Sequence, residues 1–141
     1  MNQWQASLLL CDAAQVADGK LYVLGGGWSV CGPGPFVHAL AAKIEVPWDQ
    51  ANRRHRLRAE LLDEDQNPIR LGDSVQDVFV ETDFEVGRPA GIPPGTPLDF
   101  PFAINLGPIE LPAAGAYSWR LSVDGEEIHR SHFLTRPRPK P

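Results

Sequence analysis

The residues of this chain that could do chemistry are few and lie far apart. Gly25-Gly26-Gly27 is a glycine-rich segment, and such a segment cradles phosphate when a helix follows, because the first amides of the helix then hold the anion. Here Trp28-Ser29-Val30 and then Gly32-Pro33-Gly34-Pro35 follow, and no Lys-Ser or Lys-Thr pair occurs. The segment is therefore predicted to be a turn that needs positive φ angles.

A second candidate is an acidic turn. Asp63, Asp65 and Asn67 have the spacing of the first three ligands of a calcium loop. The match ends there, because Pro68 stands where the sharp-turn glycine belongs and Ser74 where the bidentate glutamate belongs. We predict a hairpin turn capped by short acidic side chains, with weak calcium binding as the alternative.

The histidines and cysteines do not form a ligand pattern. His129 and His132 are three residues apart, which places them on opposite faces of a strand. Cys11 and Cys31 lack the CxxC spacing of zinc sites and are too few for a disulfide framework. We expect both thiols to be reduced in the cytoplasm, which disfavours a disulfide between them. Neither a GxSxG motif nor a cysteine at a helix start is present, so we expect neither an enzyme nor a cofactor.

Charge argues against nucleic acid as a partner. The net charge is −5 and the isoelectric point about 5.3, whereas nucleic-acid binders usually carry a basic excess. The only candidate anion patch is Arg54, Arg56 and Arg58 on one predicted strand. On another strand, Asp77, Glu81, Asp83 and Glu85 form an acidic stripe that is predicted to be a solvated face, and pairing with these arginines across a sheet is the alternative. The apolar runs are short, so the sequence predicts no membrane span.

The elements that must position these residues are strands. Thirteen glycines and fourteen prolines leave little room for long helices, and the dominant hydrophobic period is two. Strands are predicted over residues 6–14, 20–24, 38–46, 54–61, 77–86, 98–106, 117–123 and 126–135. This pattern predicts an all-β fold, an antiparallel β-sandwich of about eight strands of the immunoglobulin-like, Greek-key type. We expect one domain over residues 1–135, followed by a Pro/Arg-rich tail over 136–141.

The last two predicted strands carry the sharpest local signals. Tyr117 follows a glycine-bearing corner, and a tyrosine in this place often bonds to the backbone upstream as a tyrosine corner. Asp124-Gly125 is typical of a two-residue hairpin turn. The apolar parity changes between Ile128 and Phe133, which predicts a β-bulge.

Several segments of the chain carry a resemblance to known proteins: Leu8-Leu9-Leu10-Cys11-Asp12-Ala13-Ala14, the segment from Asp18 to Trp28, Leu61–Asp65, Gly115–Trp119 and Val123-Asp124-Gly125. In these segments the chain resembles a family of small bacterial proteins, frequent in actinobacteria, that is catalogued only as a domain of unknown function. The resemblance covers nearly the whole chain. It implies a sandwich fold and a bacterial cytoplasmic origin, and it brings no catalytic residues.

Exposed aromatic side chains provide the first functional hypothesis. Trp28 and Trp48 lie in predicted loops, Phe79 lies among outward carboxylates, and Phe100 and Phe102 flank Pro101 on a predicted edge strand. We therefore expect a non-enzymatic accessory module that binds a protein partner or forms a homodimer through these residues.

Two other hypotheses stay open. In the second, Trp28 or Trp48 stacks on a carbohydrate-type ligand that is also bound by Asp49 and Asn52. In the third, a metal-dependent hydrolase assembles its site from distant loops. Sandwiches host many unrelated activities, so the fold does not decide among the three hypotheses.

Overall fold

The protein is all-β in the computed structural model, which describes residues 3–70 and 78–139. The described residues form ten strands and one short 3₁₀ helix, η1. The elements are β1 (Gln5–Cys11), β2 (Ala13–Ala17), β3 (Lys20–Leu24), β4 (Val30–Cys31), β5 (Phe36–Val46), η1 (Trp48–Gln50), β6 (His55–Asp63), β7 (Phe79–Phe84), β8 (Leu98–Ile109), β9 (Gly115–Val123) and β10 (Glu126–Thr135). Among these described residues, no helix is long and apolar enough to cross a membrane.

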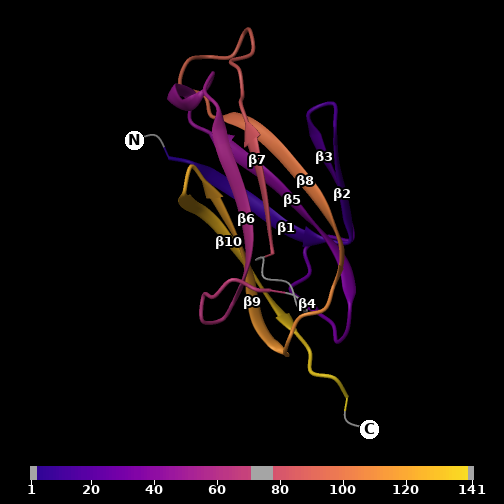
Figure 1. The fold of residues 1–141 in the computed structure, drawn as a ribbon. Coiled ribbons are helices and arrows are strands. Elements are labelled where there is room, and N and C mark those ends of the chain that lie inside the picture. The colour runs from indigo at the N-terminus through magenta and orange to yellow at the C-terminus, as the bar shows by residue number, and fades with distance from the viewer. Residues whose placement is uncertain (1–2, 71–77, 140–141) are drawn as a thin grey trace.

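The strands form three sheets (Figure 1). The first has the order β1-β5-β8, the second β4-β10-β9-β6-β7, and the third is the hairpin β2-β3. The first two sheets enclose the main core, in which Leu10, Ile44, Leu57 and Trp119 are almost completely buried. An apolar layer between two pleated sheets is the arrangement that the two-residue period predicts.

The predicted number of strands is wrong, and so is purely antiparallel pairing. The apolar run over residues 6–14 divides at Asp12 into β1 and β2, and β4 is an additional strand. β4 pairs with β10 in parallel, with Leu134 opposite Val30 and Thr135 opposite Cys31. Both differences arise where the chain changes sheet, which local alternation does not reveal.

Side chains of β5 and β9 alternate between the main core and the outer face of the sheet as the two-residue period predicts. In β5, the alternate residues His38, Leu40, Ala42, Ile44 and Val46 are all buried between the sheets. Alternate residues of β9 are buried as well: Tyr117, Trp119, Leu121 and Val123. These residues pack on the same core because side chains of a strand alternate between its two faces.

The outer face of β5 is also buried. Ala39 and Ala41, which alternation directs away from the sandwich, are 0% and 3% exposed. They form a second, small core with Cys11 and Ala14 beneath the β2–β3 hairpin. These small side chains let the hairpin lie close against the first sheet.

The local turn signals are confirmed. Asp124 and Gly125 both have positive φ, 51° and 86°, as a two-residue hairpin with a primed turn requires. The register between β9 and β10 shifts between Glu127 and His129, which places the predicted bulge at Ile128. The Tyr117 hydroxyl donates to the carbonyl of Ala113 at 2.6 Å, so the tyrosine corner is present.

One proline lies within an edge strand. Pro101 lies inside β8 opposite Lys43, and β8 is an edge strand, where a missing N–H does not break a sheet ladder. Residues 136–139 carry no strand. Asp77, the predicted start of the acidic strand, and Ser74 both lie outside the described residues, and β7 begins at Phe79.

Candidate interaction surface

Trp28 packs into one end of the sandwich. Its ring makes edge contacts with Phe36, His38 and Phe133, at centroid distances of 6.3, 5.9 and 6.4 Å. The preceding Gly25 and Gly27 have φ of 62° and 90°, so the glycine segment is the positive-φ turn that the sequence predicts. The ring therefore fills space in the fold, and its role in binding stays a prediction.

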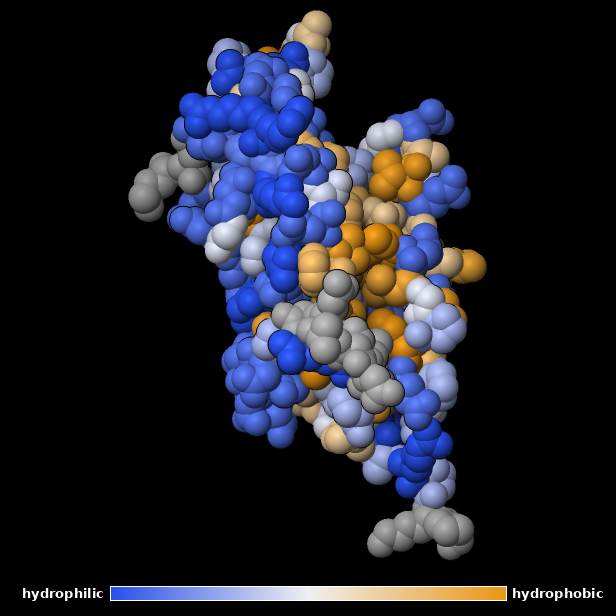
Figure 2. Space-filling view, in the orientation of Figure 1, coloured by the Kyte–Doolittle hydropathy of each residue, from blue (hydrophilic) through white to orange (hydrophobic). Residues whose placement is uncertain are grey.

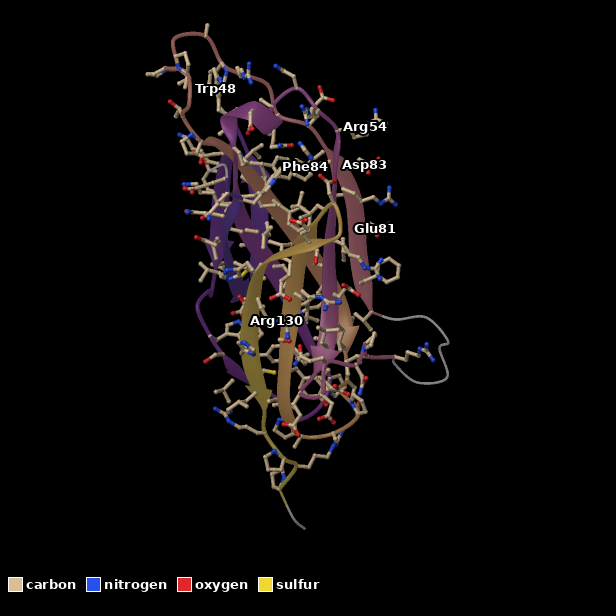
Figure 3. All side chains as sticks on the ribbon, turned by 90° about the vertical axis from the view of Figure 1, so that its left-hand side faces the viewer. Trp48, Arg54, Glu81, Asp83, Phe84 and Arg130 are labelled. Carbon is tan, nitrogen blue, oxygen red and sulfur yellow. The ribbon has the colours of Figure 1, made fainter. Side chains whose placement is uncertain are left out.

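Trp48 lies in η1, near the end of the molecule that also carries Arg54 (Figure 3). The Arg88 guanidinium lies 4.5 Å from the centre of the Trp48 ring and donates to the Trp48 carbonyl at 2.7 and 3.2 Å. Asn52 has a φ of 60°, and its backbone N–H donates to Val86 at 2.7 Å. One face of the indole on which a sugar would stack is thus covered by Arg88.

The three phenylalanines of the predicted surface lie on β7 and β8, and Figure 2 shows a hydrophobic band between these strands. Phe79 is 41% exposed, with the Arg58 guanidinium 3.9 Å above its ring. Phe100 stacks on Phe84 with the ring centres 4.5 Å apart, and Phe102 is half-buried against the core. Phe79 thus lies on the outer face of the second sheet, apart from Phe100 and Phe102, which belong to the sandwich interior.

A depression of about 600 Å³ lies on the outer face of the second sheet. It is lined by Arg56, Arg58, Glu60, Glu81, Arg120, Ser122, Asp124, Gly125 and Glu127. Figure 3 shows Glu81 and Asp83 on the strand that flanks this face.

The arginines of this face are matched by carboxylates. Arg56 binds Glu81 and also Asp83 at 3.1 Å, and Arg58 binds Glu81 at 2.9 Å. Arg120 binds Glu60 at 2.8 Å. Hydrogen bonds from Arg56 and Arg58 lower the pKa of Glu81. The structure thus has the alternative to a purely solvated acidic stripe, pairing with the arginines, at Arg56, Arg58, Glu81 and Asp83. The mutual neutralisation of these charges disfavours an anion site.

His55 and the turn at Asp63 have structural partners within the fold. His55 is buried, with Nδ1 2.7 Å from Asp124 Oδ2 and Nε2 2.8 Å from the Gln50 carbonyl. Asp63 Oδ1 accepts from the amides of Asp65 and Asn67, both at 2.9 Å, which is the predicted capped turn. Among residues 3–70 and 78–139, no three metal-binding side chains come together.

Both cysteines are free thiols, and burial raises their pKa values. Cys11 lies beneath the hairpin, where its thiol donates to the Ala39 carbonyl at 3.5 Å. A thiol with a raised pKa is a weak nucleophile, so the geometry does not favour cysteine catalysis.

The β2–β3 hairpin exposes large apolar side chains that sequence patterning missed. Leu24 is 70% exposed and Tyr22 is 54% exposed, and the neighbouring Val23 is 39% exposed. We define Tyr22, Val23 and Leu24, together with the outer edge of β3, as the hairpin surface. A depression of about 440 Å³ adjoins it, lined by Ala13, Ala14, Gln15, Tyr22, Val23, Leu24 and Asn105. Apolar residues on both faces of β3 were the signal in the sequence.

The two edges of the hairpin differ. The Asn105 side chain, on β8, binds the backbone of β2 at Ala14: its Oδ1 accepts from the amide at 3.1 Å and its Nδ2 donates to the carbonyl at 2.8 Å. Asn105 therefore occupies the edge of β2 in the way a neighbouring strand would. Within the described part of the chain, β3 pairs only with β2, so its other edge is open.

Comparison with known proteins gives a family. A family model described as "Family of unknown function (DUF6941)" matches residues 6–135. The chain belongs to this family. The resemblance stated from the sequence is confirmed to that extent. No curated protein and no solved structure matches the chain.

Membership of DUF6941 assigns no activity, so a function for this protein must be inferred from its own surfaces. The charged face of the second sheet is internally neutralised, and the aromatic rings over Arg58 and Arg88 are already in contact. The hairpin surface instead combines exposed apolar side chains with a strand edge that no other described strand covers. Such a combination favours contact with another chain.

Proposed function

We propose that this DUF6941 protein is a non-enzymatic β-sandwich accessory module that binds a protein through its hairpin surface. The observation that carries the proposal is the exposure of Tyr22 and Leu24 beside an open strand edge. A protein partner supplies both of the things that this surface lacks: apolar cover for the side chains and main-chain groups for the edge. A small ligand supplies fewer main-chain partners for a strand edge.

Contacts of β2 with the first sheet hold the hairpin in place, so that a partner would bind a preformed surface. Asn105 holds β2 from the side, and the small residues Ala39 and Ala41 hold it from below. A strand that is already ordered loses little conformational entropy when it binds, and this preorganisation improves affinity.

We also propose the finer features that the sequence implies. An immunoglobulin-like, Greek-key arrangement is supported by the Tyr117–Ala113 hydrogen bond. A bacterial, cytoplasmic protein is supported by the two free thiols, which are typical of a reducing compartment.

The proposal is tested by site-specific photo-crosslinking in the native host. A benzophenone amino acid replaces Tyr22 in one strain, and in a matched control it replaces Thr82, which is exposed on the edge strand β7 of the second sheet. We expect a protein adduct from position 22 and none, or a different one, from position 82.

The same adducts are then examined in a Leu24→Ser background. Removing this exposed side chain should weaken the adduct from position 22, because the apolar contact is lost, while the fold is kept. Equal adducts from positions 22 and 82, or none from position 22 in the folded protein, would overturn the proposal.

A further inference from the structure

We propose that the protein bound at the hairpin surface is a second copy of this chain, joined by antiparallel pairing of the two β3 strands about a two-fold axis at Tyr22. This inference rests on the proposed function and names its partner. The two hairpins then form one four-stranded sheet with the order β2-β3-β3-β2. The same surface is used by both copies, as in other two-fold dimers.

The residues of β3 are self-complementary in this register. With Tyr22 opposite its own copy, Leu21 lies opposite Val23, and Lys20 lies opposite Leu24. Directly opposed side chains have Cβ atoms about 4.5–5.5 Å apart, so the two tyrosines and the two Leu21/Val23 pairs come into apolar contact. The aliphatic stem of Lys20 covers the exposed Leu24 of the other copy.

The charges at the two ends of β3 match in the same register. Lys20 is exposed at the start of the strand. Asp12 lies at its end, because the Asp12 amide donates to the Leu24 carbonyl at 3.0 Å. Its carboxylate packs against Gly25, where a Cβ would come 2.2 Å from Asp12 Oδ2. Within the described ranges, neither Lys20 nor Asp12 has an ion-pair partner in its own chain.

The antiparallel register therefore brings Lys20 of each copy to the end of β3 in the other copy, where Asp12 lies. The two-fold axis makes this pairing twice. A shift of the register by two residues along β3 would move Lys20 away from Asp12, so the charges favour the register centred on Tyr22.

The fold also explains why the pairing ends at two copies. An open edge on each side of a sheet leads to continued growth. Here Asn105 occupies the edge of β2 at Ala14, so the outer edge of the four-stranded sheet is blocked at that residue. A closed dimer follows, rather than a fibre.

The first test measures mass and charge dependence on the purified full chain. Light scattering after size exclusion should give twice the 15.5 kDa of one chain at high micromolar concentration. Lys20→Asp and Asp12→Lys should each weaken self-association roughly ten-fold, because each places two like-charge contacts at the interface. The double variant should restore it. Arg54→Asp makes the same change of charge directly before β6, away from β3, and should leave self-association nearly unchanged.

The second test measures the register. In a Cys31→Ser background, Tyr22→Cys should form a disulfide-linked dimer under mild oxidation, because the two cysteines are directly opposite. Leu24→Cys should not, because the two positions are four residues apart along the paired strands, about 13 Å. Circular dichroism of each variant confirms that it is folded.

The outcomes separate this inference from the proposed function. A strict monomer at high concentration, or charge variants whose double substitution does not restore association, would overturn the dimer. If position 22 then still gives adducts with a different protein in the host, the interaction module stands and only its partner changes. Open-ended aggregates in place of a dimer would also overturn the closed two-fold pairing.

Discussion

The Trp119 indole donates its Nε1–H to His38 Nε2 at 3.1 Å, and this hydrogen bond joins the two large sheets through the middle of the core. Trp119 belongs to β9 and His38 to β5, and both side chains are almost completely buried. The bond requires an unprotonated Nε2 on His38, because the indole can only donate. The core therefore depends on a neutral histidine.

The first prediction is a loss of stability in acid that is caused by His38. Burial lowers the pKa of His38 from 6.5 to about 4. Below pH 6.5 the unfolded chain binds the proton and the folded chain does not, so this contribution is complete above pH 6.5 and is lost as the pH falls towards 4. Urea unfolding should show about 2 kcal/mol less stability at pH 5 than at pH 8 from this group.

His38→Gln is the control for this prediction, because its amide oxygen can still accept from Trp119 while the side chain no longer titrates. Other groups titrate in both proteins and cancel in the comparison. One is the carboxyl of Asp124: burial raises its pKa, but hydrogen bonds from Arg56 and His55 outweigh burial and lower the pKa in the folded state. The difference between the two pH profiles therefore belongs to His38. Parallel profiles would contradict the prediction.

The second prediction concerns the tyrosine corner. Tyr117→Phe removes the hydroxyl that donates to Ala113 at 2.6 Å and leaves a part-buried carbonyl without its partner. The free energy of unfolding should fall by about 1–2 kcal/mol in urea titrations. Tyr22→Phe, measured at low protein concentration, is the matched control because that ring is 54% exposed, and it should leave the stability unchanged. Equal effects of the two substitutions would mean that the corner does not stabilise the fold.

The third prediction concerns Asn105 as a clamp on the hairpin. Asn105→Leu keeps a similar volume and removes both hydrogen bonds to Ala14. Hydrogen exchange at the Ala14 amide should become roughly ten- to a hundredfold faster, because the free energy of local opening of β2 falls by about 1–3 kcal/mol. Exchange at the Trp119 amide, in the central strand β9, should change much less. Acceleration of both amides by the same factor would show global destabilisation instead of a local clamp.

The fourth prediction concerns the charged face. Glu81 binds both Arg56 and Arg58, and these bonds lower its pKa, so its contribution is present above its ordinary pKa and is lost as the pH falls. Glu81→Gln should lower the melting temperature by only a few degrees, because the network is solvated. High salt should abolish the difference from the wild type, since it screens exposed charges. A large decrease that persists in salt would point to packing and not to charge.

Several features of the fold could be read from the chain because they are local. The inner residues of β5 and β9 follow from the alternation of side chains along a strand, and this alternation is visible in the sequence of each strand alone. Asp124-Gly125 and Tyr117 are likewise local signals, since the geometry of a turn or corner depends on a few neighbouring residues.

The hairpin surface could not be read in the same way. Ala39 and Ala41 were expected on an outward face, and only the position of β2 and β3 over that face buries them. Trp28 has the same sequence context whether its ring faces water or packs on Phe36 and Phe133, and the tertiary structure makes it pack.

By itself, then, the amino-acid sequence determined that the protein is built of strands, which side chains line its main core, and where its tightest turns lie. Tertiary structure alone decided which sheet each strand joins and that Asn105 binds the edge of β2 at Ala14. It also decided that β3, among the strands of residues 3–70 and 78–139, pairs only with β2 and exposes Tyr22 and Leu24. The reason is physical: side-chain alternation and turn geometry depend on a few neighbouring residues. Which strand edges and faces become covered depends instead on contacts such as that of Ala14 with Asn105, which lie 91 residues apart.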